Sequence, residues 1–198
     1  MGFSLIRRWP LTLGIAVCAA GLMLCEPAAR WLQYERGLIL RGQIFRLVTC
    51  HLTHWSNVHA LWSGMAFVLL AGMCEIRSPL LTVTTVSISS LAIGGVMLLL
   101  LPNVEVFRGL SGIDSALLGL LAMLILRART SGASTRWLAV AAIFLFALKL
   151  TGELLGFGSL FLGKESDVKP LPVAHLIGFI TGLCIGFWPN TQRADTRS

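Results

Sequence analysis

The chain has 198 residues, of which 56% are hydrophobic and only 13% are charged. Soluble globular domains average about 25% charged residues, so this composition excludes an ordinary soluble domain, and its apolar content excludes a disordered chain. The formal net charge is +7, but every basic residue except Lys149 lies in a loop or at a chain end between apolar segments. This distribution is typical of a membrane protein and argues against nucleic acid as a partner.

Charged residues and prolines separate six apolar segments, each near the roughly 20 residues that a helix needs to cross the hydrocarbon core of a bilayer. All six are expected to be helices, because lipid offers no partner for open backbone hydrogen-bonding groups. The sequence predicts an all-α integral membrane protein, a six-transmembrane-helix bundle that forms a single domain over residues 1–198. The helices are expected at about residues 10–25, 58–74, 80–101, 111–126, 137–155 and 172–188.

The first segment has two interpretations. Arg7 and Arg8 precede it, as basic residues precede a secretory signal peptide, but no small-residue cleavage site follows it. A retained membrane anchor is therefore favoured. The N-terminal segment and the loop over residues 127–136 are both basic and fall on the same side of a six-span bundle, so both termini are expected in the cytoplasm.

Two connections differ from the others. The loop over residues 26–57 is long, amphipathic and rich in Trp, Arg and His, which predicts that it lies partly in the membrane interface. The connection over residues 156–171 contains three glycines and is a candidate mobile lid. Neither connection indicates a second domain.

No metal or cofactor site is indicated. The five cysteines have no CxxC spacing and lie mostly within or beside apolar segments, so they are interpreted as small buried hydrophobic residues. His51, His54 and His59 have no cysteine or carboxylate at ligand spacing. We therefore expect neither a metal nor a cofactor.

Polar residues inside membrane spans are costly and usually face a cavity or one another. Counting from the cytoplasmic end of each helix at about 1.5 Å per residue places Ser111, His59 and His175 within one helical turn of the same level. That level lies below the outer surface of a hydrocarbon core roughly 30 Å thick. The polar residues of the predicted spans are His59, Ser63, Ser111, Asp114, Ser115, Lys149, Glu153 and His175.

Ser111 is a candidate nucleophile. It lies in the sequence Gly109-Leu110-Ser111-Gly112 at the start of a helix, where unpaired backbone N–H groups would stabilise an oxyanion. The tetrapeptide alone is more typical of a loop followed by a helix N-cap than of a catalytic site. His175 adds to the catalytic interpretation, because it could act as general base if the two helices pack closely.

Close packing of these two helices is predicted by small residues at four-residue spacing. Such residues form a stripe on each helix. On the sixth segment they are Gly178, Gly182 and Gly186, and on the fourth they are Ser111, Ser115 and Gly119. Close approach along these stripes would bring His175 Nε2 within reach of Ser111 Oγ.

Three motifs in this order resemble the rhomboid intramembrane serine proteases. They are Gly109-Leu110-Ser111-Gly112 with Gly119 eight residues after the serine, Ala174-His175-x-x-Gly178-x-x-x-Gly182, and His54-x-x-x-x-His59. The short chain and the phrases over residues 51–56 and 109–116 are most similar to the rhombosortase branch. These are bacterial inner-membrane enzymes that process proteins with a glycine-rich C-terminal sorting tail.

The resemblance implies that Ser111 is the nucleophile and His175 the general base, in a dyad with no obligatory carboxylate. It implies an oxyanion hole or substrate-binding site formed by His59 and the backbone of residues 109–112, with His54 at the entrance. Many rhomboids have asparagine four residues after the equivalent of His59. This chain has Ser63 there, a candidate donor to the same oxyanion hole whose shorter side chain reaches less far. The implied partners are membrane-anchored protein substrates with a C-terminal transmembrane tail, and membrane lipid. Water or an amine could accept the acyl group.

Several alternatives stay open at this stage. Asp114 and Lys149 are at nearly the same depth and could form a buried ion pair, but Lys149 could instead pair with Glu153 one turn away. Lys149 is also a candidate base for Ser111. His51 and His54 have either a structural role or a role at the substrate entrance.

Two other functional classes compete with an intramembrane serine endopeptidase. A catalytically inactive rhomboid-like protein that binds transmembrane clients would share the fold, but it has no need for Ser111, His175 and His59 at one depth. A small transporter is expected to have interrupted helices or repeat symmetry, and the sequence has neither.

Overall fold

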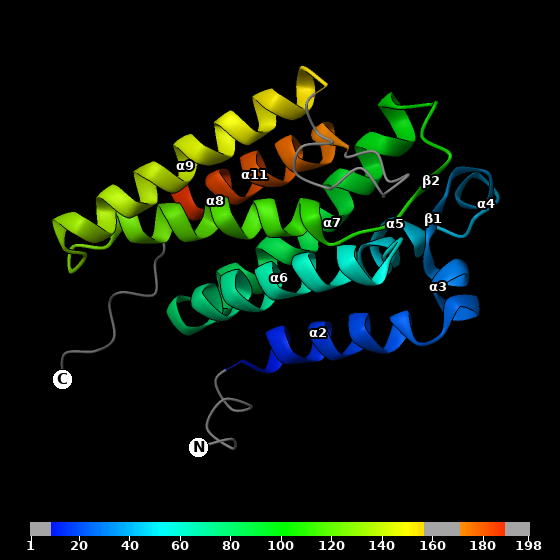
Figure 1. Cartoon of the computed structure of the whole chain (residues 1–198), viewed down its shortest axis with the longest axis horizontal. Coiled ribbons are helices and arrows are strands. Elements are labelled where there is room, and N and C mark those ends of the chain that lie inside the picture. Colours follow the sequence, from blue (N-terminus) through cyan, green and yellow to red (C-terminus); the bar gives the residue numbers. More distant parts are fainter. Residues whose placement is uncertain (1–8, 157–170, 189–198) are drawn as a thin grey trace.

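The computed structural model describes residues 9–156 and 171–188. The described chain is mostly helical (Figure 1). Its six long helices begin and end within a few residues of the six apolar segments. The connection proposed as a lid lies outside the described residues, apart from its two ends. The long helices are α2 (Pro10–Met23), α6 (Asn57–Arg77), α7 (Pro79–Leu100), α8 (Ser111–Arg127), α9 (Ala133–Leu154) and α11 (Pro172–Phe187).

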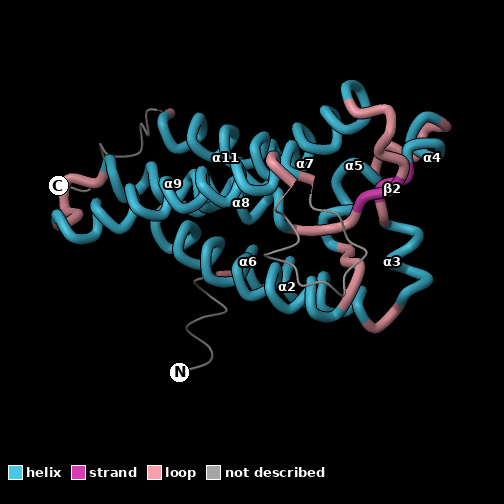
Figure 2. The backbone as a smooth tube through the Cα atoms, turned by 45° about the horizontal axis from the view of Figure 1, so that its top comes forward, coloured by secondary structure: helices cyan, strands magenta, loops and turns pink. Residues whose placement is uncertain are grey.

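The long loop between α2 and α6 forms several short elements (Figure 2). These are α3 (Glu26–Leu32), β1 (Tyr34–Glu35), α4 (Arg36–Leu40), α5 (Arg46–Thr49) and the 3-10 helix η1 (Cys50–Leu52). The two-residue strand β1 pairs antiparallel with β2 (Val106–Phe107), which lies shortly before α8. This small sheet departs from a purely α fold and joins the loop to the segment that leads into Ser111.

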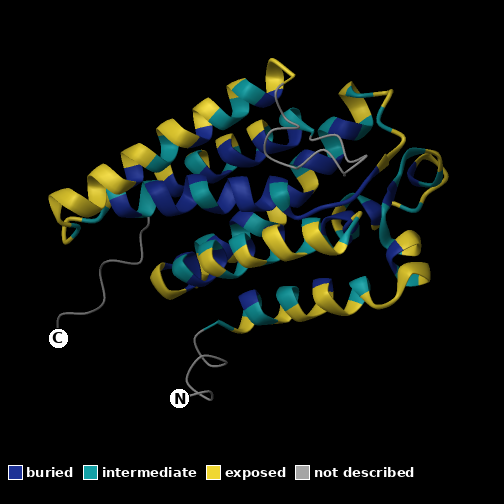
Figure 3. Ribbon diagram, viewed as in Figure 1, coloured by how far each residue is buried: buried dark blue, intermediate teal, exposed yellow. Residues whose placement is uncertain are grey.

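Helix α8 lies at the centre of the bundle, in contact with α6, α7, α9 and α11. Eleven of its residues are buried, against two of α2 and three of α9. Figure 3 shows this contrast between the central helix and the outer ones. The exposed faces of the outer helices are apolar, as expected for faces that contact lipid. The central helix therefore presents its few polar side chains to protein rather than to lipid.

Helices α8 and α11 pack with their backbones in contact. A Cβ atom built on Gly178 would lie 2.0 Å from the carbonyl oxygen of Gly112, and one on Gly182 would lie 1.8 Å from that of Ala116. Only glycine fits at these two positions of α11. Such close approach is the usual consequence of small residues at four-residue spacing in membrane helices.

The predicted stripe on α8 was wrong at two of its three positions. Gly119 faces α11, but Gly112 and Ala116 take the backbone contacts expected of Ser111 and Ser115. One residue along a helix turns the side chain by about 100°. The hydroxyl of Ser115 instead donates to the carbonyl oxygen of Ser111, at 2.8 Å within the same helix.

The described helices include three that are long and apolar enough to cross a membrane alone: α6, α7 and α9. Helices α2 and α3 would make a fourth span together, although they are bent by 118°. Helix α11 has 16 residues and α8 has 17, fewer than the roughly 20 that a complete span needs. A helix enclosed by protein can be shorter, because its ends do not face hydrocarbon.

A buried carboxylate joins the first helix to the bundle. Glu75, near the end of α6, accepts hydrogen bonds from the Thr12 hydroxyl at 2.6 Å and from the backbone N–H groups of Leu11 and Thr12. These N–H groups belong to the first turn of α2, which has no partner for them within the helix. Glu75 thus caps a neighbouring helix and has a structural role at the end of the bundle away from Ser111.

Candidate active site

The serine and histidine predicted to react lie in contact. Ser111 is the first residue of α8, and His175 lies in the first turn of α11. The distance between Ser111 Oγ and His175 Nε2 is 3.0 Å. His175 is 6% exposed, whereas Ser111 is half-buried and keeps part of its surface accessible. A histidine at this distance can take the hydroxyl proton and activate the oxygen as a nucleophile.

The turn before Ser111 is held in a conformation that favours glycine. Gly109 has φ +140°, and its N–H donates to the carbonyl oxygen of Cys50 at 3.2 Å. His51 lies between two carbonyl oxygens, at 3.2 Å from that of Gly109 and 3.3 Å from that of Ser90. Burial lowers the pKa of His51, so its ring is neutral and donates to only one of them. His51 therefore has a structural position behind the serine turn.

His59 lies beside the serine. A Cβ atom built on Gly109 would be 3.1 Å from His59 Cε1, 3.4 Å from His59 Nε2 and 3.9 Å from Ser111 Oγ. The ring of His59 and the hydroxyl of Ser111 thus face the same side of the Gly109 turn. Leu110, the N-cap residue of α8, is buried, and Gly112 packs against α11. The N-terminus of α8 therefore places unpaired backbone N–H groups next to the imidazole of His59.

Ser63 does not share this arrangement. Its hydroxyl donates to Asp114 Oδ2 at 2.7 Å, and both side chains are buried. Because a serine has one hydroxyl proton, this hydrogen bond uses the donor that Ser63 could offer to an oxyanion. The structure also pairs Asp114 with Ser63 rather than with Lys149.

A carboxylate lies on the far side of His175. Glu153 Oε2 is 2.7 Å from His175 Nδ1, and Glu153 Oε1 is 2.7 Å from Lys149 Nζ. The sequence left two partners open for Lys149, Asp114 and Glu153. The structure pairs it with Glu153, on the same helix α9. Lys149 Nζ lies 3.4 Å from His175 Nδ1, on the side of the ring away from Ser111. Lys149 therefore adjoins the histidine rather than the serine.

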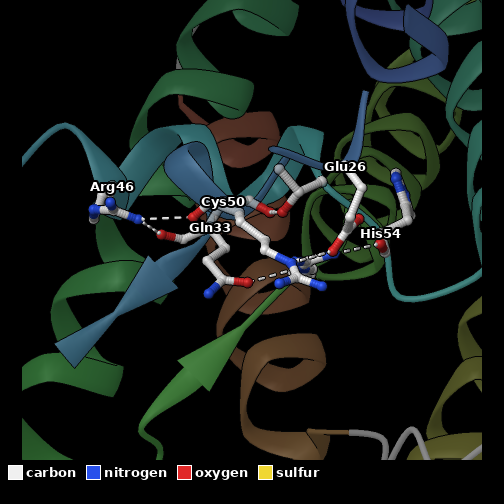
Figure 4. A network of polar contacts seen from close by, with 8 residues as sticks. Glu26, Gln33, Arg46, Cys50 and His54 are labelled. Carbon is white, nitrogen blue, oxygen red and sulfur yellow. Dashed lines mark hydrogen bonds and ion pairs between the residues drawn. The ribbon is translucent and has the colours of Figure 1, made fainter. Parts of the chain in front are cut away.

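Arg108 anchors the segment that leads into the serine turn. Figure 4 shows three of its partners, Glu26, Gln33 and His54, gathered in one network of polar contacts. Its guanidinium donates to both carboxylate oxygens of Glu26, to the side-chain oxygen of Gln33 and to the carbonyl oxygen of His54. Hydrogen bonds from Arg108 and Arg30 lower the pKa of Glu26 to about 2, so this carboxylate stays ionised. Together with the β1–β2 pair, these hydrogen bonds hold the long loop against Arg108, which lies three residues before Ser111.

Comparison with known protein families places the chain in one of them. Residues 41–189 match the model of the Rhomboid domain, which is about three quarters of the chain. The chain belongs to the rhomboid family. Family membership and the long apolar helices together make it a membrane protein.

A named relative extends this match. The rhomboid is 30% identical over 197 residues to a protein of Yersinia enterocolitica (serotype O:8, biotype 1B) named Rhomboid protease GlpG. The alignment covers 94% of this chain and 65% of the relative. The chain thus spans slightly less than two thirds of that protein's length.

The sequence analysis of the rhomboid missed the contact of Glu153 with His175. The spacing of Lys149 and Glu153 indicated their pairing on one face of α9, but not which neighbouring helix that face would meet. A buried acidic residue near the level of a candidate base was the available signal.

The rhomboid's stability is expected to depend on pH through His54. Burial, with a smaller contribution from charge on His59, lowers the pKa of His54 from 6.5 to about 4. The unfolded chain therefore binds a proton near pH 6.5, and the folded chain binds it only near pH 4. Folding stability falls as the pH drops through this window, by up to roughly 3 kcal/mol from this group.

Thermal midpoints in detergent at several pH values between neutrality and about pH 4.5 test this expectation. His54→Leu should lose less stability than the wild type over that window. Equal acid sensitivity of the two proteins would show that His54 does not titrate in this way.

Proposed function

We propose that this rhomboid is an intramembrane serine endopeptidase. The observation that carries the proposal is the 3.0 Å distance between Ser111 Oγ and His175 Nε2. The printed name of the relative, a rhomboid protease, supports the same activity.

In the proposed mechanism, Ser111 Oγ attacks the scissile carbonyl carbon while its proton passes to His175 Nε2. The developing oxyanion is bound by His59 and by the N–H groups at the mouth of α8, each donor contributing roughly 3 to 4 kcal/mol in soluble serine proteases. His175 then returns the proton to the leaving amine, which gives an acyl-enzyme. Ser63 is left out of the donor set, because its hydroxyl already donates a hydrogen bond to Asp114 Oδ2.

We further propose that the substrates are membrane-anchored proteins with a C-terminal transmembrane tail, cleaved near the periplasmic face of a bacterial inner membrane. In the membrane topology that we propose, all six long helices cross the bilayer and both termini lie in the cytoplasm. The resemblance to rhombosortases points to glycine-rich sorting tails. It also makes transfer of the acyl group to an amine an alternative to hydrolysis.

Reconstitution in liposomes tests this proposal. The reporter is a folded domain followed by a glycine-rich segment, a transmembrane helix and a basic tail, and a matched reporter has the glycines replaced by leucines. We expect cleavage of the first reporter above the second. The mass of the released product distinguishes a free carboxyl end from an amine adduct.

The competing function is that of an inactive protein that binds transmembrane clients. It predicts that the reporter co-purifies with the wild type and is never cut. Binding without cleavage, in protein that retains its thermal transition, would contradict the protease proposal.

A further inference from the structure

Glu153 and Lys149 have no role in a serine–histidine dyad, yet both contact the histidine. We propose that Glu153 is a positioning residue for His175 and that Lys149 holds Glu153 in place. This inference rests on the proposed function, because positioning matters only if His175 acts as the base for Ser111.

The side chains form a continuous chain of contacts across three helices. Glu153 from α9 lies 2.7 Å from Nδ1 of His175, and Nε2 of the same ring lies 3.0 Å from Ser111 Oγ. The side chain of Glu153 is 4% exposed and that of His175 is 7% exposed. Water therefore competes little for either contact, and a hydrogen bond between them is stronger than it would be at a surface.

The carboxylate selects the tautomer of His175. A neutral imidazole has one N–H, and an ionised carboxylate can only accept, so the proton must lie on Nδ1 for this hydrogen bond to form. Nε2 is then unprotonated and faces Ser111 Oγ as an acceptor. The opposite tautomer would present an N–H to the serine and could not take its proton.

Because Lys149 lies beside His175, the productive tautomer of His175 depends on Glu153. Its ammonium group lies 3.4 Å from His175 Nδ1 and can only donate. Without Glu153 it would favour a bare Nδ1 and therefore the unproductive tautomer. With Glu153 present, the ammonium instead donates to Oε1 at 2.7 Å, which keeps the carboxylate ionised and leaves Oε2 for the histidine.

The same arrangement stabilises charge that appears during the reaction. When the Ser111 proton passes to Nε2, the ring becomes an imidazolium with protons on both nitrogens. The carboxylate of Glu153 stays ionised and accepts the hydrogen bond from Nδ1–H throughout. No proton needs to leave His175 toward Glu153, so the groups act as in other Ser-His-carboxylate sites.

Kinetics of Glu153 variants test the inference. Glu153→Leu should lower kcat by roughly 10²- to 10⁴-fold with little change in KM, because only the base is disturbed. Glu153→Gln should also be slow, since its amide can donate to Nδ1 and stabilise the wrong tautomer. Glu153→Asp, which keeps the charge on a shorter side chain, should recover part of the rate.

A matched control separates positioning from the general effect of removing a buried carboxylate. Glu75 is 3% exposed and bonds the first turn of α2, far from the serine. Glu75→Gln should lower the thermal midpoint with kcat per folded molecule unchanged. A Glu153→Leu variant with the kinetics of Glu75→Gln would overturn the inference.

The tautomer can also be measured without any change at Glu153. Nitrogen-15 shifts of the His175 ring, assigned by loss of the signal in His175→Ala, should report a proton on Nδ1 in the wild type. A proton on Nε2 at neutral pH would overturn the inference even if Glu153 variants fail to fold.

Labelling with a fluorophosphonate distinguishes this inference from the proposed function. Folded wild type that forms no serine adduct would contradict the proposed function, and the inference with it. Wild type and Glu153→Leu that label at the same rate would leave the activated Ser111 intact and overturn the inference alone.

Discussion

Replacing Ser111 or His175 with alanine is expected to abolish cleavage of a membrane-anchored reporter. The two side chains act as one unit, so either loss should reduce kcat by roughly 10⁴-fold or more. The thermal midpoint of Ser111→Ala in detergent should change little, because Ser111 is half-buried. His175→Ala removes a buried ring that contacts Glu153, so its midpoint should fall and its kcat is compared per folded molecule. Reporter cleavage and thermal unfolding of the same preparations are the measurements.

Ser89→Ala provides the control for loss of a buried serine. The Ser89 hydroxyl donates to the carbonyl oxygen of Thr85 within α7 and has no contact with Ser111. This variant should cleave at the wild-type rate. Cleavage retained by Ser111→Ala would show that another group is the nucleophile.

Replacing Gly182 with alanine is expected to disrupt the site from a distance. The added Cβ would lie 1.8 Å from the carbonyl oxygen of Ala116, and neither backbone can move without shifting its helix. The free energy of unfolding should fall by about 3 kcal/mol, at the upper end of the usual cost of overpacking. Separation of α8 and α11 should also reduce cleavage, because these helices carry Ser111 and His175. Thermal unfolding and reporter turnover are measured together.

Gly95→Ala is the matched control within a helix. A Cβ atom at Gly95 in α7 would meet nothing within 4 Å. Its effect on stability should stay within about 1 kcal/mol, the range of helix propensity. If Gly182→Ala behaved like Gly95→Ala, the close contact of α8 with α11 would be refuted.

The long helices could be predicted because hydropathy and prolines determine where helices in lipid begin and end. Pro79 and Pro172 open α7 and α11, and Arg127 is the last residue of α8. The proximity of Ser111 and His175 could be anticipated for the same reason, since depth counted along each helix places them at one level. The small residues of α11 indicated which neighbour it would approach.

Rotation of a helix about its own axis could not be predicted with the same reliability. A helix that is apolar on all sides gives no signal for which face meets which neighbour. This is why two of the three stripe positions on α8 were one residue out of register, and why the contact of Glu153 with His175 was missed. Hydrogen bonds of the long loop, such as those of Arg108 to Glu26 and Gln33, also depend on a tertiary arrangement that the sequence does not encode locally.

The most direct test of the central claim is intact-mass analysis of purified protein after treatment with a fluorophosphonate, alongside Ser111→Ala and His175→Ala. The proposed site predicts one adduct on the wild type and none on either variant, since the reagent reacts with a serine activated by a base. No adduct on wild type with an intact thermal transition, or an adduct that persists in Ser111→Ala, would contradict it.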